Sequence, residues 1–306
     1  MKKYALLVLV FATACIAGFE SCQSSKSAAA TKMLKFDLEN GKGYDYEMIL
    51  NMDQEIMGQK MQMDMSTYYS MDVNAEDSGI KTITTKIDRF KLKTTVAGFN
   101  LEVDTDNPPV LSGSDPTDTS SVGNPLEMVN KLFGAIKGRK FSMKVNPEGK
   151  VVSVSGFEDM AAALVDSMNV DPSEREKVMK EFDKQFNGEQ IKEQMERFWY
   201  IFPNKEVKVG DSWQKSTKRS GEMPGNYNST YEVKEIEGDM VTLSEITKVD
   251  SEQQAMNLKG EITGTIVVDS RYGLVVSANQ DMDLTATAEG KSFKIKGKSK
   301  IKGKAR

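Results

Sequence analysis

Hydrophobic and polar residues alternate over long stretches of this chain, which is the pattern of half-buried β-strands. From residue 44 to residue 52 every second residue is apolar, and a similar run follows from residue 61 to residue 73. In the next run the apolar parity changes between Ile87 and Phe90. This change predicts a β-bulge near Asp88-Arg89 and, with strands this long, a strongly curved antiparallel sheet.

The alternation stops in the middle of the chain, where helical periods replace it. Asn124-Pro125 and Asp171-Pro172 each place a capping residue before a proline, which is typical of helix starts. Apolar residues then recur at helical spacing, with an interruption at Asn187-Gly188. The polar faces carry charges of both signs, so we expect these helices to pack on a sheet rather than lie on a membrane surface. After Pro203 the β pattern returns.

The two β-rich stretches resemble each other. Gly41-Lys42-Gly43-Tyr44 opens the first, and Val209-Gly210-Asp211-Ser212-Trp213 opens the second. Residues 145–153 form a hairpin pattern in the first, and residues 268–277 form a similar one with one more residue. In each, a glycine after Asn or Asp suits a tight turn. These matches suggest a degenerate duplication, the alternative being chance likeness between β sequences.

The predicted fold is therefore mainly β (α+β), with two curved antiparallel sheets, related as a degenerate repeat, and a helical insert between them. We expect a first β-rich half over residues 33–156, the helical insert over residues 157–202 and a second β-rich half over residues 203–306. A chain of 306 residues is long enough to bury a sizeable core.

Residues 1–22 have the features of a lipoprotein signal peptide. Two lysines precede an apolar run over residues 4–19, which is too short for a transmembrane helix. A small residue precedes Cys22, and residues 23–32 form a polar tether, so we predict lipidation at Cys22. The alternatives are lipidation at Cys15 and an ordinary secretory signal with incidental cysteines. The prediction places the protein in the bacterial envelope, lipid-anchored to the outer membrane and facing the periplasm.

Composition narrows the function further. The chain has 41 basic and 45 acidic residues, and its net charge of −4 argues against a nucleic-acid partner. Histidine is absent and the two cysteines lie within the signal region, which removes the usual general base, thiolate nucleophile and zinc ligands. Ser212 beside Asp211 has no histidine to activate it. We therefore expect no enzyme, no catalytic residue, no metal and no cofactor.

Methionines gather on the first two predicted strands. The alternation places Met61, Met63 and Met65 on one face. Together with Met48 and Tyr69 they are predicted to line a concavity that binds a hydrophobic or amphipathic ligand, because thioether side chains adapt their shape. The alternatives are an ordinary core, an oxidation sink, and a site for monovalent copper, which thioethers suit but which lacks histidine or cysteine co-ligands here.

The last predicted strand carries a lysine at every even position, which places six ammonium groups on one face. Such a row could meet lipid head groups or an acidic envelope polymer. The alternative is an edge strand that lysines protect from pairing with other chains. The six residues are Lys294, Lys296, Lys298, Lys300, Lys302 and Lys304.

An acidic loop is predicted between residues 104 and 123. Its aspartates suggest Ca²⁺, but Pro108 and Pro109 occupy positions where an EF-hand loop needs a ligand and a glycine, so we expect a solvated loop. The aspartates are Asp104, Asp106, Asp115 and Asp118.

Several of these segments resemble a family of uncharacterised bacterial envelope lipoproteins. The most specific is Pro-x-x-x-Val-x-Val-Gly-Asp-Ser-Trp, from Pro203 to Trp213. The lipidated start, the opening at Gly41 and the hairpin at residues 145–151 also match, so the resemblance covers residues 33–305. It implies an envelope location and no settled activity. By fold alone, a long curved sheet on a lipid tether is also similar to the half-barrel carriers of lipoprotein and lipid trafficking.

The function predicted from the sequence is a lipid-anchored envelope protein that binds an amphipathic ligand in a β concavity. Its partners would be the membrane, through the N-terminal lipid, and a lipid or acidic envelope polymer. The alternative is a structural interaction module that uses the basic C-terminal strand.

Overall fold

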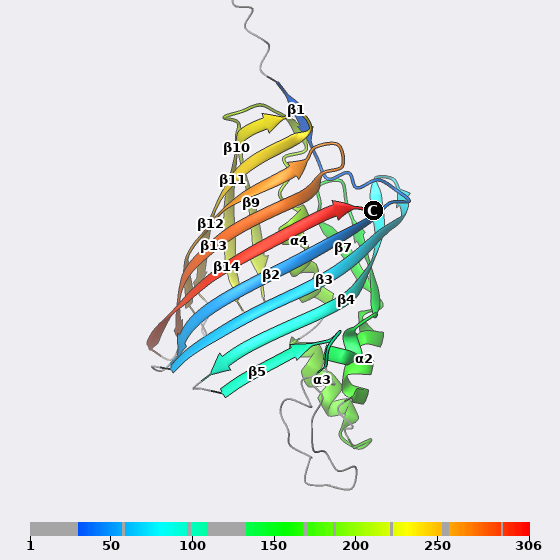
Figure 1. The fold of residues 1–306 in the computed structure, drawn as a ribbon, viewed down its shortest axis with the longest axis vertical. Helices are drawn as coiled ribbons and strands as arrows, with labels where there is room; N and C mark the ends of the chain where they lie inside the picture. Colours follow the sequence, from blue (N-terminus) through cyan, green and yellow to red (C-terminus); the bar gives the residue numbers. More distant parts are fainter. Residues whose placement is uncertain are drawn as a thin grey trace, which may run out of the picture. The chain divides into compact units, whose positions relative to one another are not determined.

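The alternating stretches form one large antiparallel sheet (Figure 1). In the computed structural model, the described residues are 30–56, 59–96, 99–108, 133–167, 171–185, 188–220, 223–252, 257–288 and 290–306. The predicted signal peptide, Cys15 and Cys22 lie outside them, as do Asp115, Asp118 and the start of the helix predicted from Asn124. The end of that helix is present as a helical turn at residues 133–136, followed by Gly138 at positive φ.

The first β-rich half contributes strands β1 (Lys32–Leu34), β2 (Gly43–Ile56), β3 (Gln59–Asp77), β4 (Ile80–Val96), β5 (Phe99–Asp104), β6 (Lys140–Val145) and β7 (Val151–Ser155). The helices are α2 (Phe157–Ser167), α3 (Arg175–Gln185) and α4 (Gly188–Trp199). The second half contributes β8 (Lys205–Val207), β9 (Ser212–Arg219), β10 (Gly225–Glu237), β11 (Met240–Glu252), β12 (Asn257–Asp269), β13 (Leu274–Ala288) and β14 (Lys291–Ala305). The helices fall within the predicted insert, and Asn187 of the predicted interruption lies outside the described residues.

The mainly β class with antiparallel sheets is confirmed. The strands of the two halves join in one continuous hydrogen-bonded sheet. Within the described ranges the main sheet runs β7-β6-β4-β3-β2-β14-β13-β12-β11-β10-β9, with β5 beside β4. The last strand, β14, pairs with β13 on one side and with β2 on the other, as the red, orange and blue strands of Figure 1 show. Strands β1 and β8 form a separate pair.

The predicted bulge is present in β4. The pairing with β3 passes over Asp88, so Ile87 and Phe90 both face the core and are each 7% exposed. The bulge also marks the point at which β4 changes its neighbour, from β6 before it to β5 after it.

The predicted duplication is visible in the hydrogen bonds of the sheet. The amide of Gly41 donates to the carbonyl of Val73 at 2.8 Å, and the amide of Gly210 donates to that of Val233 at 2.9 Å. Each valine amide in turn donates to the carbonyl of the residue after that glycine. Both glycines have positive φ, at 78° and 87°, which other residues rarely adopt. The register shifts directly after each valine.

The two matching hairpins show the same correspondence between the halves. In the β6–β7 pair the register shifts so that Val145 pairs with Val151, and in the β12–β13 pair it shifts so that Val268 pairs with Val275. Strands β2-β3-β4-β6-β7 and β9-β10-β11-β12-β13 also follow the same order across the sheet. The two halves thus have β-bulges at equivalent positions of equivalent strand pairs. Because bulges are specific local features, we conclude that the halves are a degenerate repeat.

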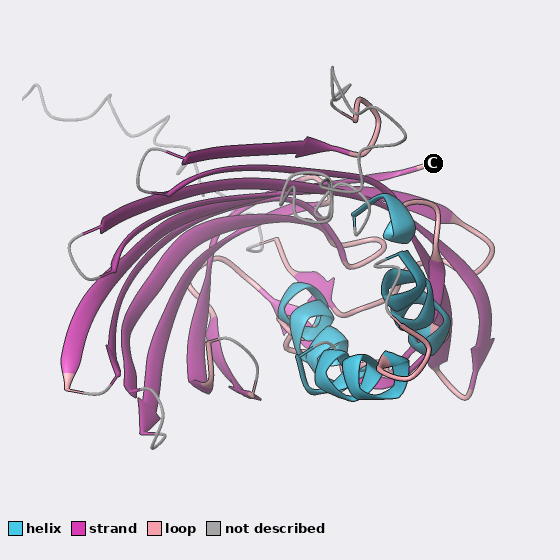
Figure 2. Ribbon diagram, turned by 90° about the horizontal axis from the view of Figure 1, so that it is seen from below, coloured by secondary structure: helices cyan, strands magenta, loops and turns pink. Residues whose placement is uncertain are grey.

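The sheet is curved, and the helices lie on its concave side (Figure 2). Helix α4 buries Met195, Phe198 and Trp199 in a core that includes residues of both halves, which confirms the prediction that its apolar stripe packs on a sheet. Within the described ranges, no helix combines the length and the apolar character needed to span a membrane.

Candidate ligand-binding face of the sheet

The concave face of β2 and β3 is closed by α4 at one end. Here the sheet and the helix leave a cavity with room for about one water molecule. The cavity is lined by Tyr46, Met48, Tyr69, Met71, Met195, Phe198 and Trp199. Two of the predicted ligand-binding residues, Met48 and Tyr69, are half-buried here and pack against the core.

Two of the residues that line this cavity carry a buried polar atom. Among the described residues, the hydroxyl of Tyr46 and the indole nitrogen of Trp199 have no hydrogen-bond partner. Burial raises the pKa of Tyr46; the indole N–H of Trp199 is close enough to oppose this rise, yet the two atoms do not meet hydrogen-bond geometry. The site has too little room for an organic ligand.

Further along the same face, the apolar side chains are only partly covered. Met61, Met63 and Met65 share the parity of the buried Met71 and are half-buried. In the register, Met63 pairs with Met52, and Met65 with Leu50. The alternation thus places the three predicted methionines on the concave face, beyond the residues that α4 covers.

This apolar surface crosses into the second half of the sheet. Met52 pairs with Gly297 of β14, which pairs with Met282 of β13. A Cβ atom at Gly297 would lie 3.3 Å from the Cε of Met282 and 3.6 Å from the Cγ of Met52, so the two methionines meet over the glycine. We call this half-buried surface the methionine strip; it consists of Leu50, Met52, Met61, Met63, Met65, Ile262 and Met282.

A buried polar group lies beside the strip, on β11. The carboxylate of Glu245, a residue 6% exposed, accepts hydrogen bonds from the hydroxyls of Thr247 (2.9 Å) and Tyr231 (3.4 Å) and from the amide of Gln280. Gly264 lies between Glu245 and Gln280 in the register. A Cβ there would lie 2.8 Å from the Cγ of Gln280, so the glycine lets this side chain reach across.

Two arginines lie near this group without a carboxylate partner. The Cζ of Arg219, at the end of β9, lies 3.7 Å from the ring centre of Tyr227, and that of Arg197, on α4, lies 4.9 Å from that of Phe198. Among the described residues neither guanidinium forms an ion pair. Burial lowers the pKa of Arg197 to about 10, and the positive charge of Arg219 adds to the effect.

Sequence reasoning missed this polar group. A signal existed for Glu245, which shares its parity with Val241, Leu243 and Val249 and so had to face inward. No local pattern pointed to Arg197 or Arg219, because they come from a helix and a strand that meet only in the folded chain.

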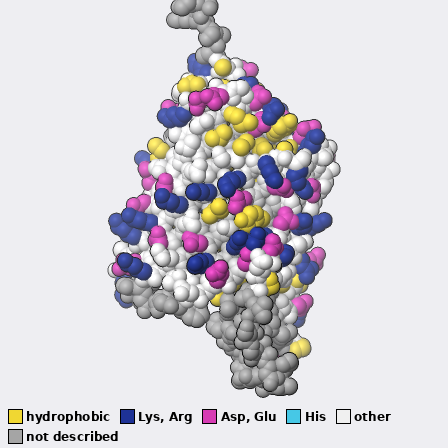
Figure 3. Space-filling model, in the orientation of Figure 1, with side chains coloured by type: hydrophobic (Ala, Val, Ile, Leu, Met, Phe, Trp, Pro, Cys, Tyr) yellow, Lys and Arg dark blue, Asp and Glu magenta, His cyan; other side chains and the backbone are white. Residues whose placement is uncertain are grey.

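The lysines of β14 are exposed on the outer face, as the alternation predicts, but the edge-strand alternative is wrong because β14 lies inside the sheet. Neighbouring strands supply carboxylates between the lysines (Figure 3). The ion pairs are Lys296–Asp283 (4.0 Å), Lys298–Asp281 (3.6 Å), Lys302–Glu47 (2.9 Å) and Lys304–Asp45 (3.5 Å). The row thus helps to join the two halves, and its use as a surface for an anionic partner stays a prediction.

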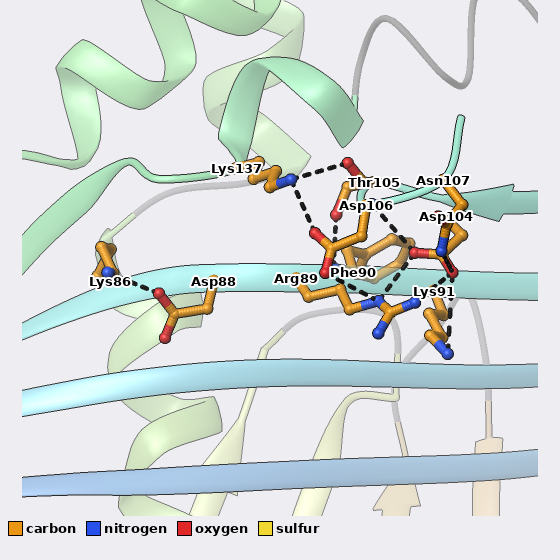
Figure 4. A network of polar contacts seen from close by, with 10 residues as sticks. All are labelled: Lys86, Asp88, Arg89, Phe90, Lys91, Asp104, Thr105, Asp106, Asn107 and Lys137. Atoms are coloured by element: carbon orange, nitrogen blue, oxygen red, sulfur yellow. Dashed lines mark hydrogen bonds and ion pairs between the residues drawn. The ribbon is translucent and has the colours of Figure 1, made fainter.

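The two described aspartates of the acidic loop are held by basic side chains (Figure 4). Arg89 donates two hydrogen bonds to Asp104, and Lys137 lies 2.7 Å from Asp106. These bonds hold the pKa of Asp104 well below its usual range. Within the described part of the chain, no group of three or more residues with metal-binding side chains comes together.

These observations define the class of the protein as a curved antiparallel sheet of two repeats with helices on its concave side. Residues 78–275 match the family described as "Family of unknown function (DUF6263)", and the chain belongs to this family. Membership of an uncharacterised family, expected from the sequence, is thus confirmed, whereas the envelope location, the lipid anchor and the Pro203–Trp213 motif stay predictions. No curated protein matches the chain.

Two solved structures are similar to the chain only weakly. One is the translocator domain of the autotransporter NalP from Neisseria meningitidis, with 7% identity and a TM-score of 0.30; the match covers 86% of this chain and 88% of that one. The other is described as "Asymmetric conductivity of engineered proteins", with 10% identity, a TM-score of 0.17, and coverage of 86% and 99%. At these scores neither likeness bears on the function.

Proposed function

We propose that this protein is a lipid-anchored component of the bacterial envelope whose concave sheet face binds the apolar part of an amphipathic molecule. The observation that carries the proposal is the methionine strip. Its side chains share the inner face with the core, yet they remain half-buried where α4 no longer covers them.

A contiguous apolar surface of this kind is typical of a binding site. Its contact with water is unfavourable in free energy, and a ligand that displaces the water removes this penalty. Methionine suits the role, since an unbranched thioether side chain can adapt to ligands of different shape. The strip continues from Met61 on β3 to Ile262 on β12. It therefore offers an elongated surface, which fits an acyl chain better than a compact ligand.

The proposed location rests on the N-terminus. A lipid on Cys22 and a polar tether would hold the concave face near the outer membrane, on its periplasmic side, where amphipathic molecules are abundant. We propose binding rather than catalysis, because the polar groups beside the strip include neither a histidine nor a cysteine.

The alternative, an interaction module that uses the lysines of β14, has less support. Four of the six lysines already face carboxylates of β2 or β13, which lowers the positive potential that an acidic partner would meet. Its test is binding to anionic vesicles, which should fall when Lys296, Lys300 and Lys304 are replaced by glutamine.

The proposal is tested by titrating the full-length protein with a neutral naphthylamine dye, whose fluorescence rises on an apolar surface. Met63→Gln keeps the size of the side chain but adds an amide to the strip, so we expect affinity to fall about tenfold. Met33→Gln, at an exposed methionine of β1, is the matched control. No dye binding by the wild type, or equal affinity of the Met63→Gln variant, would contradict the proposal.

A further inference from the structure

We propose that the amphipathic ligand carries an anionic head group and that Arg197 and Arg219 bind this group beside the methionine strip. The inference rests on the proposed function and adds the charge of the ligand and the residues that recognise it.

The geometry brings the two guanidinium groups to one place. Glu193 of α4 accepts hydrogen bonds from both the amide and the hydroxyl of Ser220, each at 2.8 Å, and so ties the helix to the end of β9. Arg197 lies one helical turn after Glu193, on the same side of α4, and Arg219 directly precedes Ser220. The contact therefore fixes two cations near each other.

Among the described residues, neither cation forms an ion pair with a carboxylate. Arg89, Arg175, Arg271 and Arg306 each form one with an aspartate, whereas Arg139 donates to the carbonyl of Ala135. The guanidinium groups of Arg197 and Arg219 lie over aromatic rings, and their like charges repel each other. A half-buried, unpaired pair of cations costs stability, so its presence points to a charge that arrives with a ligand.

The position of Arg197 places this charge inside the concavity. Arg197 is half-buried on α4, which lies on the concave side of the sheet. It interacts electrostatically with Tyr69 of β3 and Glu245 of β11, on opposite sides of the seam made by β14. Tyr69 is the second inward-facing residue after Met65 on β3. A head group bound at Arg197 would therefore leave the apolar chain of the ligand next to the strip.

The recognised chemistry is a carboxylate or phosphate on an apolar chain. A guanidinium presents a planar fork of donors that matches these groups, and two guanidinium groups can share one anion. The carboxylate of Glu245 already accepts three hydrogen bonds, so it does not compete with the head group of a ligand for hydrogen bonds from the arginines. We commit to a membrane-derived amphiphile, with a fatty acid as its simplest probe.

The test compares palmitate with hexadecanol, which has the same chain without the charge, by displacement of the neutral dye from full-length protein. We expect palmitate to bind about tenfold more tightly than hexadecanol. Arg197→Gln and Arg219→Gln should each bring the two affinities together. Arg197→Lys, which keeps the charge, should retain most of the preference, and it guards against a glutamine variant that does not fold. Lys298→Gln, which removes a charge from the outer face, should leave the preference unchanged.

The outcomes separate the two proposals. If neither palmitate nor hexadecanol displaces the dye, the proposed function fails. If both bind equally, or if palmitate keeps its preference in the two glutamine variants, the strip binds ligands and the anionic head group is wrong. An equal loss in the Lys298→Gln variant would show general attraction of anions and would also overturn the assignment to the two arginines.

Discussion

The guanidinium of Arg89 donates two hydrogen bonds to the carboxylate of Asp104, at 2.9 and 2.6 Å. The two residues come from β4 and from the end of β5, and they meet next to the bulge at Asp88. The bulge places Arg89 on the outer face, while the side chain of Phe90 is buried on the inner face. The pair therefore fastens β5 to β4 at the point where β4 leaves β6.

This pair predicts a loss of stability in acid. The folded state lowers the pKa of Asp104, so its contribution to stability is present above the unfolded pKa of about 3.9 and is lost as pH falls through the lower, folded value. We expect Asp104→Asn to be less stable than the wild type at neutral pH in urea unfolding, and the difference to shrink as the pH is lowered below about 4. A difference that is constant across this range would contradict the assignment. Asp88→Asn is a suitable control for removing a nearby carboxylate.

The unpartnered hydroxyl of Tyr46 gives a second prediction. Because a buried hydroxyl without a partner has lost its water without replacement, Tyr46→Phe should leave stability unchanged or raise it by up to about 1 kcal/mol. Tyr231→Phe is the matched control: its hydroxyl bonds to Glu245, so we expect a loss of about 1–3 kcal/mol. Urea unfolding measures both. A clear loss in the Tyr46→Phe variant would show instead that a buried water bridges Tyr46 and Trp199.

Gly264 gives a third prediction. A Cβ atom there would lie 2.6 Å from the carbonyl oxygen of Asn279 and 2.8 Å from the Cγ of Gln280. We expect Gly264→Ala to destabilise the protein by about 1–3 kcal/mol, because β13 must move and the bond from Gln280 to Glu245 is strained. Gly134→Ala, where no atom lies within 4 Å, is the control. Equal melting temperatures of the two variants would show that the crossing of Gln280 over Gly264 does not need the glycine.

The predicted anchor is tested by fractionation of cells. Cys22→Ala should release the protein from the membrane fraction, because a single alanine removes the acylation site. Cys15→Ala should leave it there. The reverse result would move the lipid to Cys15, and an unchanged distribution in both variants would contradict lipid anchoring.

Much of the local structure could be predicted from the sequence alone, because strand faces, bulges and turns follow from neighbouring residues. The change of parity between Ile87 and Phe90 was enough to place the bulge, since side chains of a strand alternate between two faces. The glycines at 41 and 210, with the hairpins that follow them, were enough to indicate the repeat.

Which surfaces are covered depends on the packing of elements that are distant in the chain. Parity placed Met48 and Met63 on the same face of the sheet, but only the packing of α4 puts Met48 against the core and leaves Met63 beyond the helix. The same applies to β14. Its lysines fitted the protection of an edge strand, but β14 pairs with β2, from the other end of the chain, and so lies inside the sheet. Arg197 and Arg219 became neighbours through the contact of α4 with β9. These are contacts between residues distant in the chain, and they depend on how whole elements bury their apolar faces, which no local pattern encodes.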